Sequence, residues 1–426
     1  MTQDAGTRKR ALIAGSIGNF IEWYEFAVYG FLATVIAHNF FQLAGEAPLT
    51  GLILTYASFA IAFFFRPLGA ILFGRLGDRI GRKPTLVLVL VLMTLATAAI
   101  GLVPIYASIG VAAPLLLTGL RILQGLFAGG EYGGAVSLMT EFAPRGRRGL
   151  YGAWQSFTVA LGLLAGAGVV ALLSALLSPQ ALYEWGWRIP FFIALPMGGV
   201  ALWLRLQLEE TPSFVQGQQN SAPVKASTAG TLRAIAIGIC RLMVWSAAGY
   251  TYLVIMPAYL QSSLNTGFNQ ALLIAVISNI GFAMTILPAG MLSDRWGRRA
   301  VMVTAAVLLL VLALPLLNIL QSPASTLGIK ALVVLVAGGL VGMLAGPGPA
   351  MLAEMFPTRV RYTGLGLAYS LSNAVFSGCA GLTITGLIKH TGNLDIPAYY
   401  VMVTAAVSIA ALMTLNKDDH RRDLKA

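Results

Sequence analysis

Long apolar segments alternate with short polar segments along almost the whole of this chain of 426 residues. A helix needs about 20 mostly apolar residues to cross the hydrocarbon core of a bilayer. Twelve segments meet this criterion, at residues 12–41, 50–74, 84–106, 110–140, 150–177, 189–207, 233–262, 268–292, 300–320, 327–355, 363–388 and 397–415. Because lipid cannot satisfy the open edge of a sheet, we expect each segment to be a helix. The pattern therefore predicts an all-α integral membrane protein with twelve transmembrane helices.

A charged decapeptide occurs twice between the apolar segments. It reads Gly-Arg-Leu-Gly-Asp-Arg-Ile-Gly-Arg-Lys at residues 74–83 and Gly-Met-Leu-Ser-Asp-Arg-Trp-Gly-Arg-Arg at residues 290–299. A second pair returns at nearly the same spacing, Glu-Phe-Ala-Pro at residues 141–144 and Glu-Met-Phe-Pro at residues 354–357. Because the two copies of each motif are separated by nearly the same number of residues, the chain is expected to contain a unit of six helices twice, in the same direction. Direct repeats with a site at their interface are typical of secondary transporters.

A polar, turn-rich segment at residues 209–231 interrupts the apolar pattern after six helices. We interpret it as a cytoplasmic linker. The predicted organisation is an N-terminal six-helix bundle at residues 1–208, the linker at residues 209–231, and a C-terminal six-helix bundle with a short cytoplasmic tail at residues 232–426.

Charged residues make up only 10% of the chain, against about 25% in soluble proteins. If the loops are assigned alternately to the two sides of the membrane with the N-terminus inside, 22 of the 28 basic residues fall on the inner side, Arg205 among them. By the positive-inside rule, we expect both termini in the cytoplasm and the chain in a bacterial cytoplasmic (inner) membrane. The net charge of +12 then reflects topology, so we expect the lipid bilayer and no nucleic acid as a partner.

The cysteines and histidines argue against a metal site, a cofactor and an enzyme. Cys240 and Cys379 fall inside predicted helices, while His38, His390 and His420 fall at helix ends or in the tail. These positions form neither a ligand cluster nor a catalytic group at mid-membrane. The short tail also argues against a membrane receptor, which would need a signalling domain.

Ionisable residues inside the predicted helices are the candidates for transport chemistry, because a charge within lipid is costly. Glu22 and Glu25 are three residues apart and Tyr29 is four further on, so all three share one helical face. A carboxyl group screened from water can hold a proton until a nearby charge changes. We therefore assign proton coupling to Glu22, Glu25 or Glu131. The alternative for each is a structural carboxylate paired with an arginine.

Arg121 and Arg241 are the candidate cations for substrate binding, one from each half. Arg121 and Gln124 share a helical face, and Arg241 lies in the seventh helix at nearly the depth of Glu22. A guanidinium stays charged and binds carboxylates through two hydrogen bonds. Pairing of Arg241 with a carboxylate of the first helix is the alternative. The other candidate cavity residues, for which packing is the alternative, are Tyr29, Tyr250, Tyr252, Tyr369 and Asn373.

The charged loops are candidate gates. Glycines in the decapeptide permit a tight turn, and its aspartate can cap the next helix or bind a cation. These loops are either topological anchors or a latch that is broken and remade as the halves move. The candidate gating residues are Asp78, Arg79, Arg82, Asp294, Arg295, Arg298, Glu141 and Arg148.

The repeated decapeptide resembles the signature loop of the major facilitator superfamily. Longer stretches are similar to its metabolite:proton symporter branch, which includes carriers of 2-oxoglutarate, citrate, shikimate and proline or betaine. They are Gly-Asn-Phe-Ile-Glu-Trp-Tyr-Glu-Phe-Ala-Val-Tyr-Gly at residues 18–30, Arg-Pro-Leu-Gly at residues 66–69, Arg-Ile-Leu-Gln-Gly-Leu-Phe-Ala-Gly-Gly-Glu-Tyr-Gly-Gly at residues 121–134, and Glu-Trp-Gly-Trp-Arg-Ile-Pro-Phe-Phe at residues 184–192. The resemblance implies the major facilitator fold, two six-helix bundles around a central cavity.

The chain departs from this branch in two places. Glu25 stands where aspartate is the commoner residue, which leaves a carboxylate at the position. The C-terminal coiled coil of osmosensing proline/betaine carriers has no counterpart, so we do not expect osmosensing.

These features predict a proton-coupled symporter that imports a small organic acid, of the di- or tricarboxylate class, by alternating access. Two candidate arginines favour an anion. The alternative is a proton symporter of a zwitterionic osmolyte such as proline or betaine. The expected partners are the substrate, protons and the bilayer, and the protein is expected to be a monomer.

Overall fold

The computed structural model describes residues 5–41, 48–80, 82–141, 143–144, 146–207, 228–356, 358–416 and 418–421. Within these ranges, it does not describe the side chains of residues 5–15, 48, 74–75, 77–80, 82, 134, 137–138, 141, 228, 358–360, 362 and 420. The predicted linker lies outside the described residues up to residue 227, and the next helix begins at residue 228.

The secondary structure of the described residues is entirely helical. The N-terminal half comprises α1 (Ala5–Phe31), α2 (Ala33–Ile36), the π-helix η1 (Ala37–Phe41), α3 (Pro48–Ile80), α4 (Arg82–Leu102), α5 (Tyr106–Ile109), α6 (Ala112–Ala128), α7 (Tyr132–Glu141), α8 (Arg148–Leu176), α9 (Pro179–Glu184), the 3₁₀-helix η2 (Gly186–Arg188) and α10 (Ile189–Leu206). The C-terminal half comprises α12 (Thr228–Tyr250), the π-helix η3 (Thr251–Ile255), α13 (Met256–Leu264), α14 (Phe268–Trp296), α15 (Arg298–Gln321), α16 (Leu327–Ala345), α17 (Gly348–Met355), α18 (Thr358–Ser372), the π-helix η4 (Asn373–Gly378), α19 (Ala380–Thr391), α20 (Ile396–Leu412) and the 3₁₀-helix η5 (Asp419–Arg421).

The helices reproduce the predicted membrane spans. Among the described residues, nine helices are long and apolar enough to cross a membrane, and α1 with α2 and η1 forms a tenth span bent by 60°. The apolar helices α6 and α20 are shorter and complete the set, α6 being followed directly by α7. Each of the twelve predicted apolar segments thus corresponds to one span, and the predicted twelve-helix membrane fold is confirmed.

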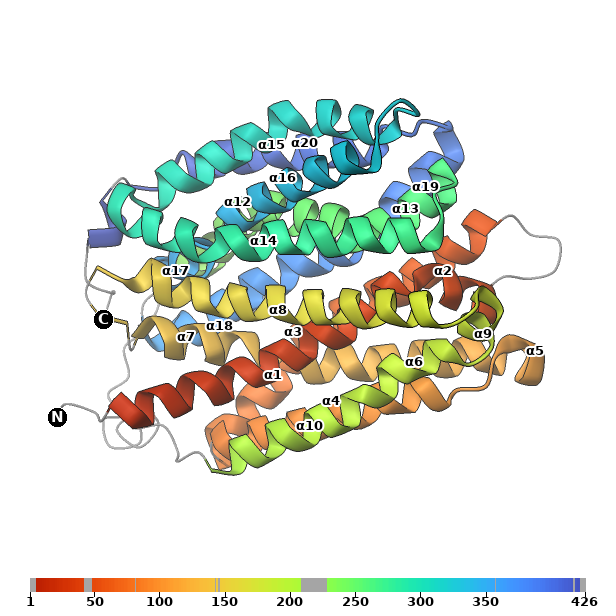
Figure 1. The fold of residues 1–426 in the computed structure, drawn as a ribbon. Coiled ribbons are helices and arrows are strands. Elements are labelled where there is room, and N and C mark those ends of the chain that lie inside the picture. Colours follow the sequence, from red (N-terminus) through yellow and green to blue (C-terminus); the bar gives the residue numbers. More distant parts are fainter. Residues whose placement is uncertain are drawn as a thin grey trace.

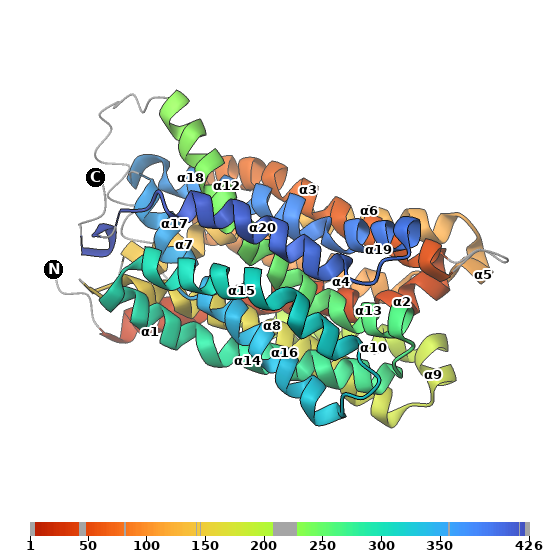
Figure 2. The same ribbon diagram turned by 90° about the horizontal axis from the view of Figure 1, so that it is seen from above.

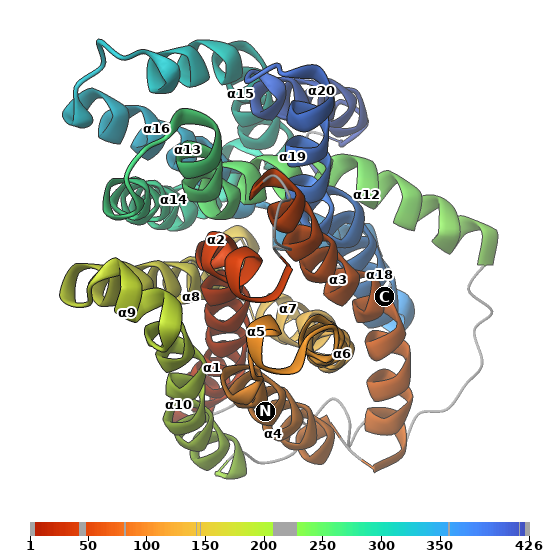
Figure 3. The ribbon, with the colours of Figure 1, turned by 90° about the vertical axis from the view of Figure 1, so that its right-hand side faces the viewer.

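The spans run roughly side by side, so the molecule has two ends. One end holds α5 and α9, and the opposite end holds α7 and α17 (Figures 1 and 2). We call the first the α9 end and the second the Asp294 end, because Asp294 lies near the end of α14 there. Along the bundle axis, α1, α4, α6 and α10 gather on one side and α14, α15, α16 and α20 on the other (Figure 3). The two halves therefore pack side by side with an interface between them.

Two glycines set the distance between the halves where α8 meets α14. A Cβ atom on Gly149 would lie 2.5 Å from the carbonyl oxygen of Gly290, and a Cβ on Gly290 would lie 2.5 Å from the Cβ of Ala153. Small residues at such a contact allow two helix backbones to approach closely. This contact positions the start of α8 against the end of α14.

Candidate functional site

A small cavity lies between the halves in the middle of the molecule. Its volume is about 30 Å³, enough for water but not for an organic substrate. Residues from α1 and α8 of one half and from α12, η3, α14, α18 and η4 of the other line it. They are Trp23, Val159, Leu163, Trp245, Ser246, Gly249, Tyr250, Leu253, Val254, Phe282, Tyr369, Asn373 and Ser377. The space at this site is therefore too small for a substrate in this conformation.

The lining of the central cavity is aromatic and contains no charged side chain. The rings of Trp23 and Tyr250 lie 6.1 Å apart, and those of Trp245 and Tyr369 lie 5.9 Å apart. The face of such a ring attracts a cation, and clusters of aromatic rings recognise quaternary ammonium groups. This lining can therefore attract a positively charged nitrogen without a carboxylate, in a conformation in which the cavity is wider.

Neutral polar groups of the C-terminal half complete the cavity lining. The Ser377 hydroxyl is 2.9 Å from Asn373 Oδ1 and donates a hydrogen bond to the carbonyl of Ser246 at 3.1 Å. The π-helical segment η4 carries both Asn373 and Ser377. Hydroxyl and amide groups can donate hydrogen bonds to a carboxylate. The same cavity thus offers groups for both ends of a zwitterion.

The sequence predicted part of this lining. Among the four residues proposed from the seventh and eleventh helices, Tyr250, Tyr369 and Asn373 line the cavity, whereas Tyr252 does not. Tyr252 is buried in η3 instead. Trp23 and Trp245 were missed as site residues. A tryptophan in an apolar helix fits lipid, packing or a cavity equally well, so the sequence carried no signal that separates these roles.

Three buried carboxyl groups lie near α1 of the N-terminal half. Glu22 forms an ion pair with Arg66 of α3, with 3.0 Å between Oε1 and Nη2. Glu131, at the break between α6 and α7, forms an ion pair with Arg205 of α10. For both glutamates, the structure therefore shows the alternative of pairing with an arginine. Arg205 had been placed in a cytoplasmic loop, but it is buried, because Glu131 gives it a partner inside the bundle.

Glycine at position 18 makes room for the second of these ion pairs. A Cβ atom there would lie 1.8 Å from Nη2 of Arg205 and 2.0 Å from Oε1 of Glu131. The pair therefore crosses α1 one turn before Glu22. The same guanidinium donates a hydrogen bond to the carbonyl of Leu86 at 2.7 Å, which ties α10 to α4.

Glu25 differs from the other two glutamates because it forms no ion pair. It is fully buried, and neither carboxyl oxygen has a hydrogen-bond partner among the described residues. The Thr97 hydroxyl and the guanidinium of Arg121 lie near enough to influence it, but neither forms a hydrogen bond of normal geometry with it. Thr97 accepts a hydrogen bond from Gln124 at 2.6 Å. Glu25 thus lies in a polar neighbourhood without a bound counter-charge.

Arg121 is likewise buried without a carboxylate partner. Its Nη1 donates to Oε1 of Gln124 at 2.6 Å, while Nε and Nη2 have no partner among the described residues. The guanidinium instead lies against aromatic rings, with its carbon 4.2 Å from the centroid of Tyr29 and 4.7 Å from that of Phe26. Predicted as substrate-binding groups, Arg121, Gln124 and Tyr29 therefore lie together beside Glu25, but none of them lines the central cavity.

Arg241 lies elsewhere and forms neither predicted contact. Its Nη2 donates to the Thr414 hydroxyl at 2.8 Å and its Nε to the carbonyl of Ala411 at 3.3 Å. These groups belong to the end of α20, so Arg241 faces another helix of its own half. It does not line the central cavity and forms no ion pair with Glu22 or Glu25. Its role in substrate binding stays a prediction.

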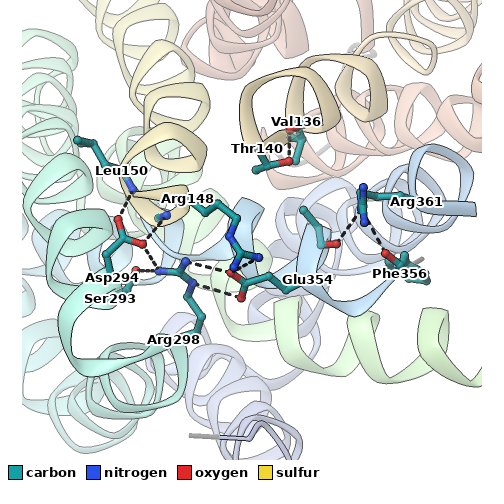
Figure 4. Close-up of polar contacts among 12 residues, drawn as sticks. Val136, Thr140, Arg148, Leu150, Ser293, Asp294, Arg298, Glu354, Phe356 and Arg361 are labelled. Carbon is teal, nitrogen blue, oxygen red and sulfur yellow. Dashed lines mark hydrogen bonds and ion pairs between the residues drawn. The ribbon is translucent and has the colours of Figure 1, made fainter. Parts of the chain in front are cut away.

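A polar cluster joins the halves at the Asp294 end (Figure 4). The carboxylate of Asp294 accepts hydrogen bonds from the backbone N–H groups of Gly149 and Leu150, at 2.7 and 3.0 Å. Arg298 binds Asp294 at 2.8 Å and holds Glu354 through two nitrogens, at 3.0 and 3.3 Å. Glu354 also lies 3.5 Å from Arg148 of the other half. We call Asp294, Arg298, Glu354 and Arg148 the latch cluster.

The latch cluster engages the beginning of α8. The first N–H groups of a helix have no partner within it, and they carry partial positive charge. Asp294 supplies a carboxylate to these groups from across the interface. Its partners are buried or half-buried, so water screens these contacts little.

Among the other predicted gating residues, the structure describes the side chain of one. Arg295 is exposed. The side chains of Asp78, Arg79, Arg82 and Glu141 lie outside the described part of the structure. Arg361, the counterpart of Arg148 in the repeat, donates to the carbonyls of Ala353 and Phe356 near the end of α17, at 3.1 and 3.2 Å (Figure 4).

A second cavity, of about 460 Å³, lies between the halves at the α9 end. The end of α8, α9 and the start of α14 surround it, and its lining includes Ser174, Tyr183, Phe268, Asn269 and Gln270. The interface is thus latched at the Asp294 end and hollowed at the α9 end.

Comparisons with known proteins agree with this architecture. A family model described as "Sugar (and other) transporter" matches residues 11–229, and one described as "Major Facilitator Superfamily" matches residues 235–425. The chain is 37% identical to a proline/betaine transporter of Escherichia coli (strain K12), over 99% of this chain and 86% of that protein. It is 35% identical to a citrate-proton symporter of Klebsiella pneumoniae, over 97% of this chain and 92% of that protein.

The fold is similar to that of a D-xylose-proton symporter, with a TM-score of 0.75 at 19% identity over 94% of this chain and 97% of that one. The family models cover both repeats, and the relatives align with nearly the whole chain. The chain therefore belongs to the major facilitator superfamily of membrane transporters, in the metabolite:proton symporter branch that its motifs resemble.

Proposed function

We propose that this protein is a proton-coupled symporter of a small zwitterion that carries a cationic nitrogen and a carboxylate, such as proline or glycine betaine. The central cavity carries this proposal, because aromatic rings and neutral polar groups line it and no charged side chain does. A zwitterion brings no net charge into such a cavity. Its nitrogen can lie against the rings, and its carboxylate can accept hydrogen bonds from hydroxyl and amide groups.

A di- or tricarboxylate is the second candidate. Burying several negative charges requires cationic partners, because an unpaired buried charge is costly. That expectation relied on Arg121 and Arg241, and neither lines the cavity. The names of the relatives include both proline/betaine transporters and citrate-proton symporters. The cavity chemistry favours the zwitterion.

For proton coupling we propose Glu25 as the proton-binding group, with Arg121 as its partner. A carboxyl group buried without a counter-charge is more stable protonated than ionised. When Glu25 loses its proton, the carboxylate gains a strong attraction for the guanidinium of Arg121, which lacks a carboxylate partner here. Protonation therefore decides whether these two groups bind each other, and so whether α1 is drawn toward α6.

Alternating access follows from the two ends of the interface. We place the Asp294 end in the cytoplasm, since the basic residues concentrate in the loops on that side. The latch cluster then closes the cytoplasmic end while the cavity of about 460 Å³ opens the other. Release to the cytoplasm requires the latch to break as the two halves rock against each other.

An uptake screen tests the proposal. The protein is expressed in a bacterium without its own osmolyte and citrate carriers, and labelled glycine betaine, proline, citrate and 2-oxoglutarate are offered. We expect accumulation of glycine betaine or proline that a protonophore abolishes. Accumulation of the carboxylates alone would replace the zwitterion by the second candidate. Accumulation that persists without a proton gradient would contradict proton coupling.

A further inference from the structure

Tyr250 is the residue at which the central cavity meets the buried charges. It is the last residue of α12 in the C-terminal half, and it lines the cavity. Its ring packs on three rings of the N-terminal half, 6.1 Å from Trp23, 5.9 Å from Phe59 and 5.4 Å from Phe63. One side chain thus spans the interface between the moving halves.

The rings that receive Tyr250 also carry the buried arginines. The guanidinium carbon of Arg66 lies 4.4 Å from the centroid of Phe63 and 5.5 Å from that of Trp23. The guanidinium carbon of Arg121 lies 5.1 Å from the centroid of Phe59. A layer of aromatic rings therefore separates the cavity from the charges. Any displacement of Tyr250 acts on rings that hold a cation.

The Tyr250 hydroxyl is free to bind a ligand. It is buried, and it has no hydrogen-bond partner among the described residues. The charged and titratable groups that act on it are Arg66 of α3, Tyr369 of α18, Glu22 of α1 and Arg121 of α6. A buried hydroxyl without a partner gains more from a new acceptor than one that is already bonded. A carboxylate entering the cavity supplies that acceptor.

We propose that Tyr250 couples substrate binding to protonation, because its hydroxyl donates a hydrogen bond to the substrate carboxylate while its ring positions the aromatic layer beneath Arg66 and Arg121. This inference rests on the proposed zwitterion transport and adds the residue that links the two sites. The hydroxyl determines affinity. The ring is a positioning group, since it packs on Phe59, which lies against Arg121 of the proposed proton site.

Tyr252 offers a matched control. It is two residues further along, it is buried, and its hydroxyl also lacks a partner among the described residues. It does not line the cavity. Tyr250→Phe and Tyr252→Phe therefore remove the same atom from two buried tyrosines, and only the first is a residue that lines the cavity.

The experiment compares purified wild type, Tyr250→Phe and Tyr252→Phe in proteoliposomes. The apparent KM for glycine betaine is measured between about pH 5.5 and pH 8, together with exchange at saturating substrate. In the wild type, KM should fall as the pH falls, because the protonated carrier binds the substrate. Tyr250→Phe should raise KM about tenfold, the effect of one lost hydrogen bond to a charged group, and should still exchange substrate. Tyr252→Phe should match the wild type.

A further variant separates the ring from the hydroxyl. Phe59→Leu keeps the Tyr250 hydroxyl but removes the ring between Tyr250 and Arg121 of the proposed proton site. It should leave KM at low pH within about twofold of wild type and flatten the dependence of KM on pH. A wild-type KM in Tyr250→Phe, an equal change in Tyr252→Phe, or an unaltered pH profile in Phe59→Leu would each overturn the inference. If the wild type carries citrate instead, the proposed substrate fails, and the same comparison made with citrate still decides the role of Tyr250.

Discussion

Oδ1 of Asp294 accepts the backbone N–H of Gly149 at 2.7 Å, so a side chain of one half caps a helix of the other. This contact depends on the close approach of α8 and α14, where a side chain on Gly149 or on Gly290 would collide with the opposite helix. A helix is ordinarily capped by a side chain that lies only a few residues away along the chain. Here the cap forms only when the two halves meet at the Asp294 end, so its presence indicates the state that is closed at this end.

Asp294→Asn should therefore destabilise the state that is closed at the Asp294 end. Asparagine loses the charge that attracts both the start of α8 and Arg298, and we expect a cost of about 1–2 kcal/mol. That cost corresponds to a shift of about five- to thirtyfold toward the state open at this end. Labelling of a cysteine at Ser246 by an impermeant thiol reagent, with Cys240 and Cys379 replaced by serine, measures the shift.

Asp395→Asn is the control for the latch. Asp395 accepts a hydrogen bond from Gln321 at 3.0 Å, a contact within the C-terminal half. Its replacement should leave labelling from the Asp294 side unchanged. If Asp294→Asn also leaves labelling and transport unchanged, the charged loop acts only as a topological anchor.

Glu25→Gln should uncouple transport with little loss of stability. The amide keeps the shape of a protonated carboxyl group but cannot titrate. Because Glu25 forms no ion pair, the change leaves no buried cation without its counter-charge. Concentrative uptake should vanish, while exchange of substrate should persist and become insensitive to pH between about 5.5 and 8. Counterflow and protonophore-sensitive uptake in proteoliposomes separate the two activities.

Glu22→Gln and Glu131→Gln should behave differently, since each breaks a buried ion pair. Removing one partner of such a pair typically costs about 3–5 kcal/mol. We expect lower yields of folded protein and a lower midpoint of thermal unfolding, largely restored when Arg66 or Arg205 is replaced by methionine in the same chain. Full concentrative uptake by Glu25→Gln would remove Glu25 from the proton site and return the assignment to these two residues.

The hydrophobic pattern was sufficient to predict the twelve spans, because lipid requires long apolar helices and leaves few alternatives. The same physics identified Glu22, Glu25 and Glu131, since a carboxylate inside an apolar segment is conspicuous. The partners of these residues could not be predicted. Arg205 lies at the end of an apolar segment, where a basic residue usually anchors a loop, and only the packing of α10 beside α1 brings it to Glu131.

The side of the helix to which the Arg241 side chain points could not be predicted from the sequence either. A transmembrane helix without a clear apolar stripe does not reveal which face meets the cavity and which meets a neighbouring helix. The π-helix η3 adds a further difficulty, because its wider turn changes the face on which Tyr252 and its neighbours lie relative to a regular helix. The position of Arg241 within the seventh helix could be read from the sequence, but its rotation about the helix axis could not.

Arg241→Lys tests whether this arginine binds substrate or supports α20. Its hydrogen bonds to Thr414 and to the carbonyl of Ala411 indicate support, so lysine should leave substrate affinity within about twofold of wild type. Arg241→Met should lower stability by about 1–3 kcal/mol, because two acceptors lose a charged donor. Binding affinity and thermal unfolding, measured on the same preparations, distinguish the roles. A tenfold loss of affinity in the lysine variant would return Arg241 to the binding site.

Trp245 should discriminate a cationic nitrogen from a neutral group of the same shape. It lines the central cavity and lies beside Tyr369, so its ring would face a substrate in a conformation in which the cavity is wider. Glycine betaine and 3,3-dimethylbutanoate differ only in the replacement of the quaternary nitrogen by carbon. The wild type should prefer glycine betaine by about five- to thirtyfold, which corresponds to a desolvated cation–π contact of about 1–2 kcal/mol.

In Trp245→Leu this preference should shrink to about twofold or less, and in Trp245→Phe it should take an intermediate value, because phenylalanine attracts cations less strongly than tryptophan. A ratio of two ligands measured on one protein is insensitive to a general loss of stability or of active fraction. Trp203→Leu, at a residue of α10 that is 61% exposed, should keep the wild-type ratio. Equal affinities of the wild type for the two ligands would show that the cavity recognises only the carboxylate, and the zwitterion proposal would lose the observation that carries it.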